Sequence, residues 1–225
     1  MRAARRAAIM AGGKQGRVLS RLQEGDRLKI IEAGNAVPFY IAKHDYESSR
    51  NQTGRTLVVR QLLYDVRPWH NDDVNAYATS DIDAWFNGTY YDLLDADIKT
   101  QITAVVIPYT PGYGNWNVSD LSRKVFALSV TELGHAATYA NIEGSALPTA
   151  GILQSAYTSV GTTRNQWTRS PNTIGNDSAY FLRGSGDVTH SYCYYRGCCS
   201  RPAFTLPFDL PVSLRPDADG CYTVV

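Results

Sequence analysis

The residues best suited to chemistry gather near the end of the chain, in the segment THSYCYYRGCCSRPAF at positions 189–204. This segment holds Cys193, Cys198 and Cys199, and the remaining cysteine, Cys221, follows closely. Adjacent cysteines are poorly placed to bridge each other, whereas spacing leaves a disulfide between Cys193 and Cys221 open. Structural zinc sites usually contain C-x-x-C pairs, and this segment has none. We therefore expect no structural metal.

Familiar catalytic patterns are also missing. The histidines at 44, 70 and 135 stand beside no Ser or Cys in a nucleophile setting such as G-x-S-x-G. The GSG at 184–186 is a turn, because no lysine follows to complete a phosphate-binding loop. We expect neither a catalytic residue nor a cofactor.

Length and charge narrow the class of protein. The 225 residues suit one domain, and 22 Lys plus Arg against 21 Asp plus Glu give no excess that would favour nucleic acid as a partner. No run approaches a membrane helix, and the apolar run near the start is too short for a signal peptide. Residues 1–24 form a basic arm, either a solvated helix or an anchor and oligomerisation segment. The domain itself is expected over residues 25–225.

The elements that must position this chemistry change along the chain. The runs DRLKII, VPFYIAK, TLVVRQLLY, ITAVVIPY and KVFALSV have the β-branched and aromatic composition of strands. Between them, Ser80 and Asp83 form a capping box for a helix that puts Ile82, Trp85 and Phe86 on one face, and Asn87-Gly88 should end it. From residue 158 on, the chain is polar and rich in turns, with strand character only at AYFLR and SYCYY.

A compositional bias marks the last quarter of the chain. Lys, Glu, Gln, Met and Trp occur 23 times in residues 1–167 and never in residues 168–225. At the earlier rate, such an absence has a chance on the order of 10⁻⁴. These five types are the ones that no codon ending in a pyrimidine encodes. The Tyr, Cys, Arg, Gly, Ser, His, Asn and Asp that crowd the segment can all be written that way.

Several motifs of the chain resemble those of a protein family in which such a compositional bias is expected. The motifs TLVVRQLLYDVRPW, S-x-I-x-x-W-x-N within YATSDIDAWFNGTYYDLL, KVFALSVTELG, WTRSP and RPAF are similar to those of an uncharacterised domain family of bacteriophages and gut bacteria. Its members resemble the C-type lectin-like fold of formylglycine-generating enzymes, and some are variable proteins diversified by retroelements. The resemblance implies an α+β fold with a small twisted antiparallel sheet, two helices and long C-terminal loops. It also implies a framework role for six residues: Trp167, Arg169, Pro171, Arg201, Pro202 and Phe204.

The residues between these framework motifs, about 172–200, are then expected to be displayed as a variable binding segment. Tyrosines supply stiff amphipathic surface, and small polar or Arg side chains add hydrogen bonds, as in antibody loops. The expected ligand-binding residues are Asn176, Asp177, His190, Ser191, Tyr192, Tyr194, Tyr195 and Arg196. Strand alternation within SYCYY leaves Cys193 as a buried small hydrophobe.

The function expected from this resemblance is non-enzymatic binding of a protein or glycan receptor. The binder would sit on a virion or cell surface, act as a homo-oligomer, and attach to a phage particle through residues 1–24. The alternative is an oxidase, because SYCYYRGC also resembles the active-site strand of formylglycine-generating enzymes. There, two cysteines spaced like Cys193 and Cys198 bind copper, and a thiolate pair does suit Cu(I).

Overall fold

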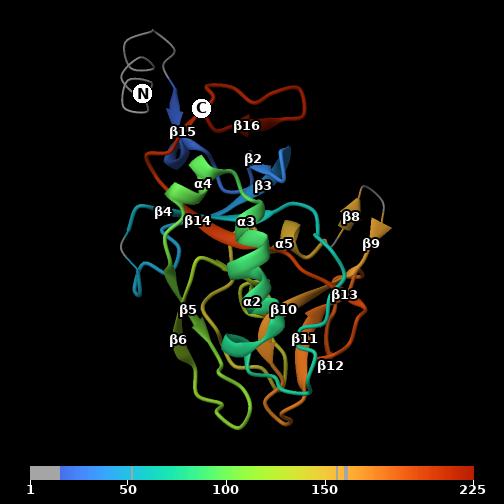
Figure 1. Ribbon diagram of the computed structural model, residues 1–225. Coiled ribbons are helices and arrows are strands. Elements are labelled where there is room, and N and C mark those ends of the chain that lie inside the picture. The colour runs from blue at the N-terminus through green and yellow to red at the C-terminus, as the bar shows by residue number, and fades with distance from the viewer. Residues whose placement is uncertain (1–15, 52, 156, 160–161) are drawn as a thin grey trace.

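A computed structural model describes residues 16–51, 53–155, 157–159 and 162–225. In these residues the chain is mostly β-structure, with two larger sheets, three two-stranded ribbons and short helical segments (Figure 1). The larger part of the basic arm, residues 1–15, lies outside the described residues, so its expected role as an anchor is not addressed by the fold.

The larger sheet has six strands in the order β16-β2-β3-β4-β14-β7. Their bounds are Cys221–Thr223 (β16), Arg27–Glu32 (β2), Asn35–His44 (β3), Arg55–Arg60 (β4), Ala203–Pro207 (β14) and Val125–Phe126 (β7). β2 alternates outward and buried residues, with Leu28 and Ile30 in the core, whereas the central strand β4 buries four consecutive residues, Thr56 to Val59. The RPAF motif thus supplies strand β14, which pairs with β4 along its whole length.

The second sheet has four strands in the order β12-β11-β10-β13. They span Val188–Tyr192 (β12), Ser178–Leu182 (β11), Asn165–Pro171 (β10) and Cys198–Cys199 (β13). β10 contains the WTRSP motif and pairs antiparallel with β11 but parallel with β13. Strand β12 has a neighbour on one side only, so it forms an edge that faces away from the buried β10.

Three ribbons complete the β-structure. β1 (Arg17–Val18) pairs with β15 (Pro211–Val212), β5 (Val105–Tyr109) with β6 (Ser119–Arg123), and β8 (Tyr157–Ser159) with β9 (Thr162–Thr163). The first ribbon joins the start of the described chain to its end. Residues Leu19 and Leu22, which follow β1, are buried in the main core.

The helical stretch is a string of short pieces. It consists of a 3₁₀ turn at Tyr77–Thr79, α2 (Asp81–Trp85), a π-helical turn at Phe86–Tyr90, α3 (Tyr91–Leu93) and α4 (Ala96–Gln101), and α5 (Ala150–Leu153) lies elsewhere. Only half of the expected capping box is present: Ser80 Oγ accepts the N–H of Asp83, but the Ser80 N–H donates to the Tyr77 carbonyl instead of the Asp83 carboxylate. Asn87-Gly88 does not end the helix as expected. It widens the helix instead, and the Asn87 amide donates to the Val125 carbonyl of β7.

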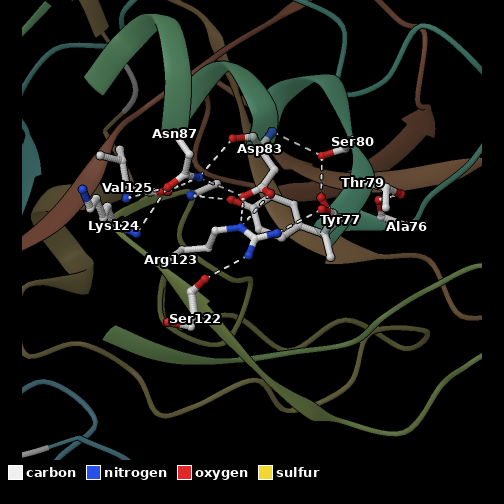
Figure 2. Close-up of polar contacts among 12 residues, drawn as sticks. Ala76, Tyr77, Thr79, Ser80, Asp83, Asn87, Ser122, Arg123, Lys124 and Val125 are labelled. Carbon is white, nitrogen blue, oxygen red and sulfur yellow. Dashed lines mark hydrogen bonds and ion pairs between the residues drawn. The ribbon is translucent and has the colours of Figure 1, made fainter. Parts of the chain in front are cut away.

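The motif S-x-I-x-x-W-x-N is a polar junction between this helix and β6–β7 (Figure 2). The Asp83 carboxylate accepts two bonds from Arg123 Nε, the shorter at 2.7 Å, and Arg123 also donates to the Ala78 carbonyl. Burial raises the pKa of Asp83 to about 6 although the Arg123 charge acts in the opposite direction. Ile82 and Phe86 are fully buried, whereas Trp85 is only partly buried, with its ring under the Arg67 guanidinium at 3.3 Å. This junction holds the helix on the six-stranded sheet.

The fold class expected from the resemblance is wrong. The chain is not a C-type lectin-like α+β domain with one small antiparallel sheet and two helices, because its helices are short and its strands form several sheets. Two physical reasons account for the difference. Leu94 adopts an extended conformation and stops the helix before α4. The turn-rich last third buries enough apolar residues, Trp167, Phe181 and Phe204 among them, to form strands where loops were expected.

In the described residues, no helix is both long enough and apolar enough to cross a membrane.

Candidate functional site

The framework beneath the expected binding segment is anchored by two buried arginines. Arg169, in β10, donates to the carbonyl oxygens of Pro108 and Ala127, and it forms an ion pair with Glu132 at 2.6 Å. Both charged side chains of this pair are 0 % exposed. Tyr46 also donates its hydroxyl to Glu132, at 2.5 Å. The arginine of WTRSP thus joins β10 to segments more than 35 residues away.

Arg201, at the start of RPAF, is equally buried but has no carboxylate partner among the described residues. Its guanidinium donates to the Gln166 amide oxygen and to four main-chain carbonyls, those of Arg60, Gln61, Leu153 and Ser155. Burial without a counter-charge lowers the pKa of Arg201 to about 10. The six expected framework residues, Trp167, Arg169, Pro171, Arg201, Pro202 and Phe204, are all buried.

The expected binding residues lie above this framework, on β12 and the turn that follows it. The edge strand places His190 opposite Tyr180 and Tyr192 opposite Ser178. His190 and Tyr192 therefore point to the same face of the sheet, with Ser191 between them on the other. His190 is exposed, and its ring packs edge-on against the buried Tyr180 at 5.6 Å.

Two tyrosines form the most exposed aromatic pair of this surface. The rings of Tyr192 and Tyr194 stack at 5.5 Å between centroids and an interplanar angle of 2°. They remain 52 % and 48 % exposed. Beside them, Arg196 is exposed and donates to Asn71 Oδ1 at 3.0 Å. The strand and turn thus present two flat rings and a guanidinium to solvent.

Tyr195 differs from its neighbours because it also packs against the framework. It is 39 % exposed, and its ring contacts Trp167 and Phe181 with centroids 6.4 and 6.2 Å away. The ring also covers Gly197 so closely that a Cβ there would lie 2.1 Å from Tyr195 Cζ. Tyr195 therefore fixes the shape of the turn as well as displaying an edge.

The loop at 172–178 carries Asn176 and Asp177, and the side chain of Asn75 makes three of the hydrogen bonds that hold it. The buried Asn75 amide donates to the carbonyl oxygens of Asn172, Gly175 and Ser178, at 2.8 to 3.0 Å. The main-chain N–H of Asn75 donates to the Asn176 carbonyl at 2.8 Å. We call this set of contacts the Asn75 clamp. It leaves Asn176 exposed and Asp177 partly exposed.

The loop and the tyrosine turn are neighbours. The Cys193 N–H donates to the Asp177 carbonyl, and the Cys193 carbonyl accepts from the N–H groups of Trp69 and His70. Cys193 itself is 0 % exposed, as strand alternation predicted. The structure therefore brings Asn176, Asp177, Tyr192 and Tyr194 to one end of the second sheet.

Sequence reasoning missed several apolar side chains at this end. Tyr113, Tyr139 and Ile174 are 60 %, 43 % and 66 % exposed. The Tyr113 N–H donates to Asn75 Oδ1, and the Thr173 N–H donates to the Tyr139 carbonyl. The loops around 113, 139 and 174 therefore meet beside the Asn75 clamp. The Gly- and Asn-rich sequence TPGYGNWN predicted a loop that contains Tyr113, but it gave no indication of which loops would lie beside it.

The four cysteines are free and buried, so the Cys193–Cys221 bridge is not formed. Burial raises the pKa of the Cys193 and Cys198 thiols well above its usual range. The charges that act on Cys193 are those of Asp73 and Asp177, whereas Cys198 lies beside Cys199 and Asn165. The described residues contain no group of three or more His, Cys, Asp or Glu side chains placed to hold a metal ion.

The sequence matches the model of a protein family. Residues 53–208 match the family described as "Domain of unknown function (DUF6273)". No curated protein and no solved structure matches the chain. The matched range includes β4, the helical stretch, both framework arginines and all of the expected binding residues.

Proposed function

The chain belongs to the DUF6273 family, and we propose that this member is a non-enzymatic display protein that binds a protein or glycan receptor. The binding surface consists of the Tyr192–Tyr194 pair, Tyr195 and Arg196, together with His190, Ser191, Asn176 and Asp177. The observation that carries the proposal is the exposed, stacked tyrosine pair on a turn whose main chain is fixed by contacts of the buried Cys193. Exposed aromatic and Arg side chains on a rigid support are typical of interface hot spots.

The burial of the cysteines favours binding over the oxidase alternative. A copper site of the thiolate type requires two accessible thiols that lose their protons readily. Burial of Cys193 and Cys198 favours the protonated thiol at each position. Cu(I) titration into the wild type and a Cys193→Ser/Cys198→Ser variant tests this directly. Tight one-to-one binding of Cu(I) by the wild type that is lost in the double variant would favour the oxidase over the binding protein.

Binding is tested by removing the exposed side chains that do not support the framework. The triple variant Tyr192→Ser/Tyr194→Ser/Arg196→Ser should keep its thermal unfolding temperature and lose capture on arrays of glycans and on target cells. A matched control, Leu214→Ser/Arg215→Ser, changes two exposed residues beyond β15, at the other end of the molecule (Figure 1). Unchanged capture by the triple variant contradicts the proposed surface.

We further propose that a retroelement diversifies residues 172–200 and that the protein acts from a virion or cell surface. The absence of Lys, Glu, Gln, Met and Trp after residue 167 supports the first part. Avidity makes an oligomer, attached through residues 1–24, the effective form of such a binder. The coding DNA tests diversification. Codons for 172–200 without a preference for pyrimidine third positions, and no near-copy repeat downstream, contradict it.

A further inference from the structure

A polar pocket lies beside Gly197 of the tyrosine turn, where β10 begins and β11 ends. Its volume is about 340 Å³, and its walls include Thr163, Arg164, Asn165, Arg183, Ser185 and Gly197. Gly197 is the residue that the Tyr195 ring covers. The pocket and the proposed binding surface therefore meet at Tyr195.

The alternation of the strands explains why the pocket and Tyr195 share a face. Trp167 of β10 lies opposite Phe181 of β11, and their rings are in edge contact at 5.6 Å. Asn165 and Arg183 each lie two positions from these rings, so they extend the same face beyond the aromatic cluster. Tyr195 packs on both rings. On this face of the sheet, the aromatic pair Trp167 and Phe181 is therefore followed directly by Asn165 and the cationic Arg183.

Gly184 allows two segments of the pocket wall to pack closely together. A Cβ at Gly184 would lie 2.8 Å from the Cβ of Thr163 and 3.3 Å from the Arg164 nitrogen. Only a residue without a side chain lets the turn after β11 approach β9 this closely. The pocket is therefore a feature of the packing between these two segments.

The two arginines of the pocket are unusual in this chain. Among the arginines of the described residues, four donate no side-chain hydrogen bond and form no ion pair: Arg21, Arg164, Arg183 and Arg215. Arg164 and Arg183 are exposed and line the same pocket. Among the described residues, no acidic side chain belongs to its walls, and Asp187 nearby accepts a bond from Ser185 Oγ at 3.0 Å. Two arginines without a side-chain partner therefore line one small space.

Guanidinium groups recognise oxyanions through parallel N–H donors, and the effect is greatest where two of them converge. The neutral polar residues Thr163, Asn165 and Ser185 complete the walls beside them. The volume lies at the lower end of small-molecule pockets, which suits one sugar ring. Gly197 in the wall is covered by the Tyr195 ring, so an aromatic surface borders the pocket at this point.

We infer that this pocket binds the anionic group of an acidic sugar, a sulfate ester or a carboxylate, at the end of a glycan ligand. The inference rests on the proposed binding function and assigns its ligand class. The tyrosine pair, which lies at the opposite end of β11 from the pocket, contacts a different part of the glycan, and the pocket selects for its charge.

The test is a titration of the full chain, followed by amide chemical shifts, with four separate probes. They are N-acetylglucosamine 6-sulfate, N-acetylneuraminic acid, inorganic sulfate and neutral N-acetylglucosamine. We expect saturable shifts at 163–165 and 183–185 with at least one acidic sugar. Inorganic sulfate should shift the same amides weakly, and the neutral sugar should not. The two acidic sugars distinguish a sulfate ester from a carboxylate.

The decisive variant is Arg164→Gln/Arg183→Gln, and its matched control is Arg21→Gln/Arg215→Gln, which removes the other two unpaired arginines. The first should weaken binding of the acidic sugar by about tenfold or more, because two charge-assisted contacts are lost. The control should bind as the wild type does. Equal weakening in both variants, or equal binding of the neutral sugar, overturns the inference.

The same variants separate this inference from the proposed function. If the pocket variant keeps wild-type capture of target cells while the Tyr192→Ser/Tyr194→Ser/Arg196→Ser variant loses it, the pocket fails alone. If the triple variant captures cells normally while the pocket variant loses the acidic sugar, the tyrosine surface fails alone.

Discussion

Two pairs of arginines in the last third of the chain lie in opposite environments. Arg169 and Arg201 are 0 % and 1 % exposed, and their guanidinium groups bind main-chain carbonyls from distant segments. Arg183 and Arg196 lie in the same stretch, yet both are exposed. The difference arises from position, because Arg169 and Arg201 lie on or beside strands in the interior, whereas Arg183 and Arg196 lie in turns. The same residue type thus stands both in the buried interior and on the exposed surface of this stretch.

The largest expected effect comes from removing the framework charge that has a buried partner. Arg169→Met should lower the free energy of unfolding by about 3–5 kcal/mol, because Glu132 is left without its cation in the core. Arg196→Ser, on the displayed side, should change it by less than about 0.5 kcal/mol. Denaturant unfolding of both variants measures the contrast. Similar losses in the two would remove the distinction between the regions.

Asp83 provides a pH test of the framework. Burial raises its pKa from 3.8 to about 6, so the folded state binds this proton more tightly than the unfolded state does. The stabilisation from this group is complete below about pH 4 and is lost as the pH rises through 6. At about 1.4 kcal/mol per pKa unit, the loss is roughly 3 kcal/mol.

The measurement is the free energy of unfolding at several pH values between 4 and 7.5, for the wild type and for Asp83→Asn. The amide cannot titrate, so the variant should lack this part of the pH dependence. If the free energy of unfolding varies with pH in the same way in both proteins, the Asp83 carboxylate does not contribute to the pH dependence.

Gly197 tests where the buried framework meets the exposed tyrosine turn. In Gly197→Ala, the new methyl group meets the ring of Tyr195, which must leave its place against Trp167. We expect a loss of about 1 kcal/mol and a changed near-ultraviolet signal of Trp167. The control is Gly151→Ala, where no atom lies within 4 Å of the added Cβ. An unchanged signal in Gly197→Ala would place the Tyr195 ring elsewhere.

The smallest effect on stability is expected at the apolar residues that sequence reasoning missed. Tyr113→Ser/Ile174→Ser should change the free energy of unfolding by less than about 0.5 kcal/mol per site, because both side chains are mostly exposed. Capture of target cells should nevertheless fall if these loops belong to the binding surface. Array and cell-binding assays of this variant define how far the surface extends from Tyr192.

The sequence predicted local features better than the architecture. Short β-branched runs such as those at β2 and β4 form strands, and the Ser80 cap is present, because both depend on neighbouring residues. The α+β fold was wrong because strand pairing in the last third depends on partners that no local pattern identifies. The parallel pairing of Asn165 with Cys198 is one case.

The same limit applies to the candidate site. Alternation was enough to bury Cys193 between exposed tyrosines. It did not place Tyr195 on Trp167, nor bring the loops at 113 and 174 together, since these contacts join residues that are distant in sequence. The pocket between Arg164 and Arg183 was missed for the same reason, because it exists only where two turns meet.

The Asn75 clamp has a practical consequence for protein engineers. It holds the loop at 172–178 only through main-chain carbonyls, so no side chain of that loop is needed for those bonds. The side chains of Ile174, Asn176 and Asp177 can therefore be exchanged in a combinatorial library while Asn75 and Gly112 stay constant. Gly112 must stay because a Cβ there would lie 2.1 Å from the Asn75 carbonyl oxygen. Short peptides can be grafted into this loop, where the Asn75 clamp fixes their main-chain conformation.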